Sequence, residues 1–165
     1  MDAYETYKHR IMTKQQFTIS YLPLAIKAGE RYGMLAEVIL AQAAIESGWG
    51  GSYGARVRKN FFGITAAGSP NTYWDGSYSV SQNQYQLKFR EYKTDQDSFY
   101  DFARLISSKY KSAHSVSSDS TAYAQAIAYS PYISEQNGDN RENYKNLIIS
   151  SFNSISAIVK KKDRS

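Results

Sequence analysis

The most regular feature of the chain is an apolar segment that fits a single helix over Leu35–Ser47. Apolar side chains occupy nearly the whole circumference of this helix, a pattern typical of a helix that other elements enclose on all sides. Gly48 is expected to end it, because glycine adopts the left-handed conformation of a C-cap without strain. Glu46 lies in the last turn. The pattern therefore predicts a central helix with one acidic group at its carboxyl end.

Amphipathic helices are predicted on both sides of this segment. Apolar residues recur there at intervals of three and four positions, which is the spacing of one helical face. The expected helices cover residues 21–32, 95–111, about 120–128 with Ser120 or Thr121 as cap, and 141–159. Ser20 is expected to cap the first of them, with Pro23 in its first turn and Gly33 after its end. The serine-rich residues 112–121 are predicted to form a loop.

The segment between the central helix and residue 94 has a different character. Glycine, serine and asparagine separate short pieces, of which Phe61–Thr65, Asn71–Tyr78 and Tyr85–Tyr92 are the candidate strands. Polar and apolar positions alternate at period two in the last piece, as in a strand with one buried face. We therefore expect a small β-hairpin lobe over about residues 60–93. The fold class is α+β, mostly helical, with this lobe inserted after the central helix.

The length of 165 residues suits one domain with a single core. We expect an N-terminal arm over residues 1–19, the domain over residues 20–159 and a basic tail over residues 160–165. There is no apolar run of about 18 residues, so no membrane insertion is expected. Residues 1–17 lack the apolar core of a secretory signal, and the route of export is left open.

Composition narrows the possible chemistry. The chain has no cysteine and only two histidines, which excludes a disulfide scaffold and a thiol nucleophile. His9 and His114 are far apart in sequence and are expected at the surface, so we expect no metal site and no cofactor. The net charge of +5 suits an anionic polymer such as a bacterial cell wall. Nucleic acid is not expected as a partner, because no recognition motif accompanies the charge.

Glu46 is the acidic residue best placed to take part in catalysis. The negative end of the helix dipole and burial beside Trp49 would both raise the pKa of its carboxyl group. A carboxyl group that stays protonated near neutral pH can act as the general acid of a glycosidase. An equally open alternative is an ion pair with Arg56 or Arg58 that ties the lobe to the helix. Trp49 could stack on a sugar or pack in the core.

Several motifs, in order, resemble the flagellar-type peptidoglycan glucosaminidases of glycoside hydrolase family 73, within the lysozyme-like superfamily. They are Ala41–Gly50 (AQAAIESGWG), Gly54–Arg56, Asn60–Ile64, Phe89–Tyr92, Asp97–Phe102, Tyr132–Ser134 and Asn143–Tyr144. The resemblance covers about residues 20–155. It implies a lysozyme-like α+β fold and hydrolysis of the β-1,4 bond between N-acetylglucosamine and N-acetylmuramic acid.

The resemblance also implies roles for single residues. Glu46 matches the general acid, and Tyr132 matches a tyrosine placed in the active site. Phe62 and Tyr144 match positions that line the substrate groove. Trp49 and Trp74 are further candidates for sugar contacts, because aromatic rings offer sugars an apolar face.

The chain departs from the family pattern on the β lobe. Many members carry a second acid after a Trp-x-Gly segment, but residues 77–82 contain none. Asp75 is the only carboxylate between Glu46 and Glu91, so it is the candidate second catalytic group; the alternative is a turn residue in Trp74–Gly76. Either Asp75 activates a water, or the substrate's own acetamido oxygen attacks while Tyr132 steadies it.

The expected function is therefore a monomeric peptidoglycan hydrolase that acts on glycan strands in the bacterial cell envelope or outside the cell. Two other functions fit the same sequence. A muramidase or lytic transglycosylase would cut the other β-1,4 bond and can use a single acid. A wall-binding module would keep the cleft without turnover, which the missing lobe acid would explain.

Overall fold

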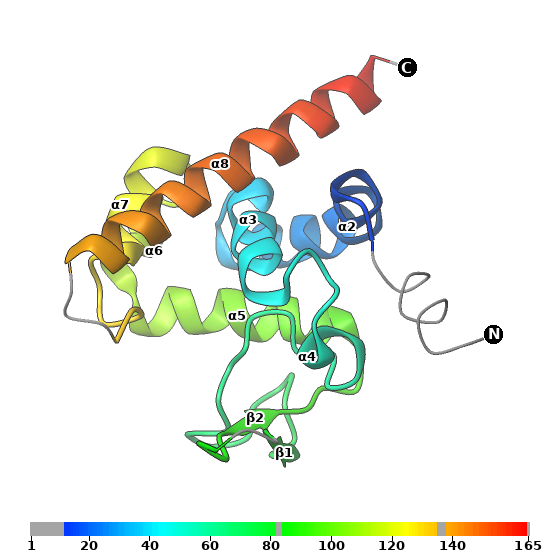
Figure 1. Cartoon of the computed structure of the whole chain (residues 1–165), viewed down its shortest axis with the longest axis vertical. Coiled ribbons are helices and arrows are strands. Elements are labelled where there is room, and N and C mark those ends of the chain that lie inside the picture. The colour runs from blue at the N-terminus through cyan, green and yellow to red at the C-terminus, as the bar shows by residue number, and fades with distance from the viewer. Residues whose placement is uncertain (1–11, 82–83, 135–137, 165) are drawn as a thin grey trace.

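The structure is a computed structural model that describes residues 12–81, 84–134 and 138–164. The helices are α2 (Lys14–Tyr32), α3 (Ala36–Ser47), α4 (Tyr53–Arg56), α5 (Asp95–Lys109), α6 (Lys111–Ser115), α7 (Ser120–Ala128) and α8 (Gly138–Asp163), and the strands are β1 (Tyr78–Val80) and β2 (Lys88–Arg90). Figure 1 shows α3 at the centre of the helices, with the two strands in a lobe beyond its carboxyl end. The expected fold, mostly helical with a lobe after the central helix, is confirmed.

The central helix forms as the apolar pattern predicts. Helix α3 packs against α2 and α8, and Val38, Ile39 and Leu40 are fully buried. Burying such a side chain stabilises the fold by about 1.5–3 kcal/mol each. Gly48 has a φ of 55° and donates its backbone N–H to the carbonyls of the last turn, which ends the helix. The packing of α3 and its cap at Gly48 thus fix the position of its carboxyl end.

The beginning of the first described helix differs from the sequence-based expectation. Ser20 lies inside α2, and the N-cap is Thr13, in a capping box with Gln16. Thr13 accepts from the Gln16 N–H at 3.0 Å, and the Gln16 side chain accepts from the Thr13 N–H at 2.9 Å. The predicted cap at Ser20 is therefore wrong, and residues 14–19 of the expected arm are helical. Fully buried Phe17 anchors this turn; residues 1–11 of that arm lie outside the described residues.

The β lobe is smaller than predicted. Strands β1 and β2 pair antiparallel, with Tyr78 opposite Arg90 and Val80 opposite Lys88. Of the expected strand over residues 71–78, only Tyr78 is in a strand, and residues 71–77 form bends, because they include Asn71 and Gly76, which favour turns. Asn60 fastens the lobe: its side-chain amide donates to the carbonyls of Ile64 and Arg90, both at 3.0 Å.

The C-terminal half departs from the prediction at three places. Helix α6 occupies part of the predicted loop over residues 112–121, and His114 within it is half-buried, with Nε2 2.5 Å from the Tyr32 carbonyl oxygen. Asp119, not Ser120 or Thr121, caps α7 by accepting from the Ala122 N–H at 2.9 Å. Helix α8 continues to Asp163, where three lysines in its last turn favour helix formation through the dipole. Among the described residues, no helix combines the length and apolar character needed to cross a membrane.

Candidate active site

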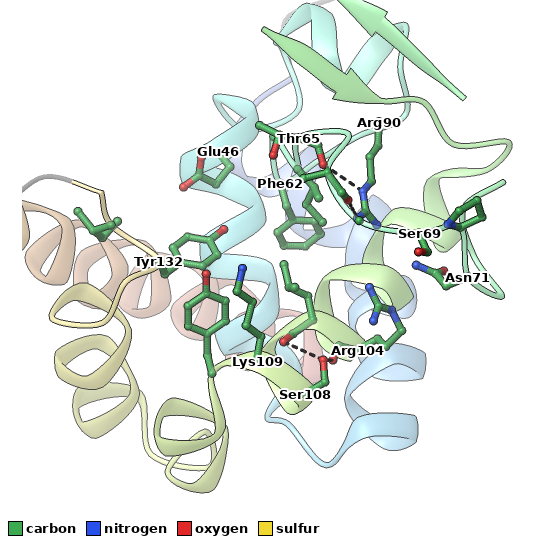
Figure 2. Close-up of a pocket in the computed structure, with 18 residues that line it drawn as sticks. Glu46, Phe62, Thr65, Ser69, Asn71, Arg90, Arg104, Ser108, Lys109 and Tyr132 are labelled. Carbon is green, nitrogen blue, oxygen red and sulfur yellow. Dashed lines mark hydrogen bonds between the residues drawn. The ribbon is translucent and has the colours of Figure 1, made fainter. Parts of the chain in front are cut away.

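A cleft of about 760 Å³ lies between the carboxyl end of α3, the loop that follows it and one face of α5 (Figure 2). The lining residues are Glu46, most of the segment Phe62–Asn71, Arg90, residues of the last turns of α5, and Tyr110, Tyr132 and Ile133. Glu46 is the only carboxylate among the described residues that line it. Among these lining residues, acid chemistry therefore falls to Glu46.

The surroundings of Glu46 shift the pKa of its carboxyl group. The Tyr144 hydroxyl donates to its Oε1 at 2.7 Å. Burial raises the pKa of the Glu46 carboxyl group above its usual value, and the hydrogen bond from Tyr144 offsets part of this rise because it stabilises the charged form. The carboxyl group therefore stays protonated to a higher pH than a carboxyl group in water, as a general acid requires.

The alternative role of Glu46, an ion pair with Arg56 or Arg58, is not realised among the described residues. Arg56 donates through Nε to the Gly51 carbonyl at 3.0 Å. Arg58 donates through Nε to Ser79 at 2.7 Å and contacts the rings of Tyr53 and Phe89. Arg58 thus ties the lobe down without using Glu46, whose carboxyl group remains available to the cleft.

A buried chain of hydrogen bonds supports Glu46 from behind. Gln42 lies one turn before Glu46 on α3, is fully buried, and donates through Nε2 to the Tyr144 hydroxyl at 3.2 Å. The hydroxyl of Tyr123, on α7, donates to Gln42 Oε1. Tyr144 lies on α8, so the chain joins three helices behind the carboxyl group. Our sequence-based site omitted Gln42, although a glutamine in an apolar helix one turn before the acid was a usable signal.

Tyr132 lines the cleft near Glu46, as expected (Figure 2). Its ring packs edge-on against Tyr110, with centroids 5.4 Å apart, and lies 6.4 Å from the ring of Tyr144. Burial, followed by the charge of Glu46, raises the pKa of the Tyr132 hydroxyl well above its usual value. Tyr132 is therefore a neutral hydrogen-bond donor and acceptor at the cleft wall.

Phe62 and Tyr144 have different positions relative to the cleft. Phe62 lines it, but the ring is only 2% exposed and stacks on Phe102 with centroids 3.9 Å apart. Phe62 thus shapes the floor of the cleft. Tyr144 is absent from the described lining and instead holds Glu46.

The structure does not bring Asp75 to Glu46. Asp75 lines a separate, smaller depression together with Glu91 and Lys93. Its Oδ1 accepts from the Ser77 N–H at 2.9 Å, and its Oδ2 lies 3.7 Å from Lys93 Nζ. Hydrogen bonds from Ser77 are the main cause that lowers the pKa of Asp75. These contacts are those of a turn residue, the alternative that the Trp-Asp-Gly segment suggested.

The two tryptophans also lie outside the cleft lining. The Trp74 ring is 4% exposed, donates through Nε1 to the Ser77 carbonyl at 2.7 Å and lies 4.0 Å from the Arg90 guanidinium. Trp49 packs edge-on against Phe17, with centroids 5.5 Å apart. Both rings contribute packing in this conformation and present no open face to the cleft.

Asp101 organises the wall of the cleft opposite Glu46. This carboxylate is fully buried and accepts from Arg90 at 2.7 Å, Tyr92 at 2.5 Å, Asn71 at 2.9 Å and Arg104 at 2.9 Å. Arg90 in turn donates to the backbone carbonyls of residues 65 and 67, which lie in the cleft loop. The loop therefore takes its shape from α5 through one carboxylate. In the described part of the chain, no group of three or more His, Asp or Glu side chains could hold a metal ion.

Replacing Tyr144 with phenylalanine tests the hydrogen bond to Glu46. The bond favours the charged carboxylate, so its loss raises the pKa of Glu46 further. Because the general acid must be protonated, we expect the alkaline limb of the kcat–pH profile to move to higher pH. The plateau kcat should fall by less than about tenfold, the scale of one hydrogen bond. Tyr129→Phe is the control, since Tyr129 is exposed and donates to Glu142 at 2.8 Å. An alkaline limb that stays in place would contradict this role of Tyr144.

The chain is similar to several known proteins. A family model described as mannosyl-glycoprotein endo-beta-N-acetylglucosaminidase matches residues 22–157. Peptidoglycan hydrolase FlgJ of Pseudomonas aeruginosa is 27% identical over an alignment of 146 positions, which covers 78% of this chain and 35% of that protein. Peptidoglycan hydrolase FlgJ of Vibrio parahaemolyticus is 30% identical over an alignment of 135 positions, which covers 73% of this chain and 42% of that protein. The chain thus spans less than half the length of these relatives.

The fold has solved counterparts. The glycoside hydrolase domain of FlgJ from Salmonella typhimurium superposes with a TM-score of 0.73 at 24% identity, covering 93% of this chain and 94% of that one. This likeness concerns the fold alone. It confirms the lysozyme-like fold class expected from the sequence.

Proposed function

Because the chain belongs to this glucosaminidase family, glycoside hydrolase family 73, we propose that it hydrolyses the β-1,4 bond between N-acetylglucosamine and N-acetylmuramic acid in peptidoglycan, with Glu46 as general acid. The observation that carries the proposal is Glu46, the single carboxyl group among the described residues that line the cleft, whose pKa is raised by burial and which accepts a hydrogen bond from Tyr144. The relatives named peptidoglycan hydrolase support the choice of polymer.

The reaction begins with a proton transfer. Glu46 donates its proton to the glycosidic oxygen while the bond from that oxygen to the anomeric carbon breaks. Positive charge develops on the anomeric carbon and the ring oxygen. The acetamido oxygen of the same N-acetylglucosamine residue attacks the anomeric carbon and forms a cyclic intermediate, so that no second carboxylate is needed. Water then opens this intermediate and returns its proton to the Glu46 carboxylate.

Tyr132 is the residue that we assign to the acetamido group. Its hydroxyl stays neutral and lines the cleft on the side of Glu46. A phenol can donate to or accept from an amide, so Tyr132 would hold the acetamido oxygen near the anomeric carbon. Tyr132 would thus position the group that attacks, and would not itself transfer the proton of the first step.

A mechanism through Asp75 is the second possibility and has a different stereochemical outcome. Water activated by a carboxylate on the opposite face of the sugar inverts the anomeric carbon, whereas attack by the acetamido oxygen retains it. The depression that holds Asp75 is separate from the cleft, which favours the retaining route. We therefore expect the first product, observed by NMR before mutarotation, to be the β-anomer. A first product in the α form would support Asp75 instead.

Analysis of reducing ends on purified peptidoglycan tests the bond that is cut. We expect free N-acetylglucosamine at the reducing ends of the released fragments. Muramic acid ends would identify a muramidase, and anhydromuramic ends a lytic transglycosylase, and either result would reject the proposed bond. Binding without release of fragments would identify a wall-binding module.

The proposed substrate also gives the place of action. An enzyme that cuts peptidoglycan works in the bacterial cell envelope or outside the cell, and the net charge of +5 favours contact with an anionic wall. We propose that the chain acts there as a monomer, because the cleft is assembled from elements of one chain.

A further inference from the structure

The cleft has a strongly asymmetric charge distribution. One wall is the carboxyl-terminal half of α5, which contributes Arg104, Ser108 and Lys109, and Arg90 lies beside it. Three of the described lining residues are thus basic, whereas Glu46 is the only acidic one among them. A neutral sugar needs no such excess of positive charge, so this wall requires its own explanation.

The basic side chains of this wall differ in how many ion pairs and hydrogen bonds they already make within the protein. The Arg90 side chain is 7% exposed and is bound by Asp101 and two backbone carbonyls. The Arg104 side chain is 30% exposed and bonds Asp101 through Nε. Asp101 balances only one of these two guanidinium groups. Together with Lys109, the wall therefore retains two net positive charges.

Lys109 and Arg104 both face the cleft. Figure 2 shows the Lys109 side chain pointing from α5 into the cavity and the Arg104 guanidinium directed toward the loop with Ser69 and Asn71. Among the described residues, no ion pair involves Lys109. The two residues are five positions apart on one helix, so about 7.5 Å separates them along its axis. They can approach one extended anionic ligand at two points.

We propose that Arg104 and Lys109 form a subsite for a carboxylate carried by the N-acetylmuramic acid residue of the substrate. This inference rests on the proposed function, in which the bond is cut beside that residue. Guanidinium and ammonium groups bind carboxylates through charge-assisted hydrogen bonds. The carboxylate belongs to the peptide stem or, where the stem has been removed, to the lactyl group. The subsite would select peptidoglycan over uncharged polymers with the same β-1,4 linkage.

The test compares substrates that share one glycan and differ in charge. The first is intact peptidoglycan, the second is peptidoglycan whose carboxylates have been converted to amides, and the third is glycan stripped of its stems by an amidase, which exposes the lactyl carboxylates. The ratio of kcat/KM for the intact over the amidated substrate measures the contribution of the carboxylates. It is compared between the wild type and Lys109→Gln, which removes one exposed charge.

We expect Lys109→Gln to lower this ratio about fivefold, the upper range for a partly exposed ion pair. Lys27→Gln, which changes an exposed lysine on α2 outside the cleft lining, is the control and should leave the ratio unchanged. Arg104→Gln should lower the ratio as well. Because Arg104 also donates to Asp101, the melting temperature of this variant is measured to detect any loss of stability. An unchanged ratio in Lys109→Gln would overturn the subsite.

The stripped glycan identifies the source of the carboxylate. If Lys109→Gln is impaired on this substrate too, the subsite also accepts the lactyl carboxylate; if the impairment disappears, it binds only a carboxylate of the peptide stem. Both results support the subsite. Failure of the proposed function is a separate outcome, since it appears as wild-type fragments without N-acetylglucosamine at their reducing ends. If those ends are present and Lys109→Gln matches the wild type, the subsite alone is wrong.

Discussion

Replacing Glu46 with glutamine is expected to lower kcat at least about 100-fold, while binding to peptidoglycan is kept. Glutamine has the shape of the protonated acid and can still accept the hydrogen bond from Tyr144, but it has no proton to give to the leaving oxygen. General acid catalysis contributes a factor of about 10²–10⁴. Release of reducing ends measures turnover, and co-sedimentation with insoluble peptidoglycan measures binding.

Glu30→Gln is the matched control for this experiment. Glu30 is an exposed residue of α2 outside the cleft lining, so the same loss of charge there should leave turnover unchanged. Turnover at the wild-type rate in Glu46→Gln would contradict the assignment of the general acid. A simultaneous loss of turnover and binding would instead mean that Glu46 acts chiefly on the shape of the cleft.

Replacing Asp101 with asparagine is expected to lower the free energy of unfolding by about 3 kcal/mol. The substitution keeps the size of the side chain but removes the only charge among the described residues that pairs with buried Arg90. An uncompensated buried charge of this kind costs about 3–5 kcal/mol. Urea denaturation measures the change. Turnover should fall as well, because Arg90 holds the carbonyls of the cleft loop.

Asp97→Asn provides the comparison for Asp101. Asp97 lies in the first turn of the same helix and is only partly buried, so losing its charge removes only a favourable contact with the helix dipole, worth at most about 1 kcal/mol. An Asp101→Asn protein as stable as the wild type would show that Arg90 is adequately paired without the carboxylate. The loop would then be held by backbone contacts alone.

The sequence was sufficient for the central helix, whose structure follows from nearby residues. The apolar circumference of α3 and the glycine after it predicted the central helix, and the helix placed Glu46 in its last turn. The capping box of Thr13 and Gln16 is also a local sequence pattern, and it predicts the observed start of α2. In these segments the decisive contacts are made within a few residues, so local pattern carries the information.

The residues that surround Glu46 could not be predicted from local sequence patterns. Tyr144 is 98 positions from Glu46, and Tyr123 is 81 positions from Gln42, so only the packing of three helices brings their hydroxyl groups together. The same limit applies to Asp75: a Trp-Asp-Gly segment has the same local chemistry whether its carboxylate faces the cleft or a turn. The orientation of the lobe decides between the two.

The sequence by itself thus determined the central helix, the place of Glu46 in its last turn and the family to which the motifs point, because each depends on residues that are close in the chain. The tertiary structure decided what surrounds that acid. It placed Tyr144 and Gln42 behind Glu46, excluded Trp49, Trp74 and Asp75 from the described lining of the cleft and set the basic face of α5 along its wall. Such choices depend on long-range packing, in which burial and charge balance select one arrangement among many that the local sequence permits.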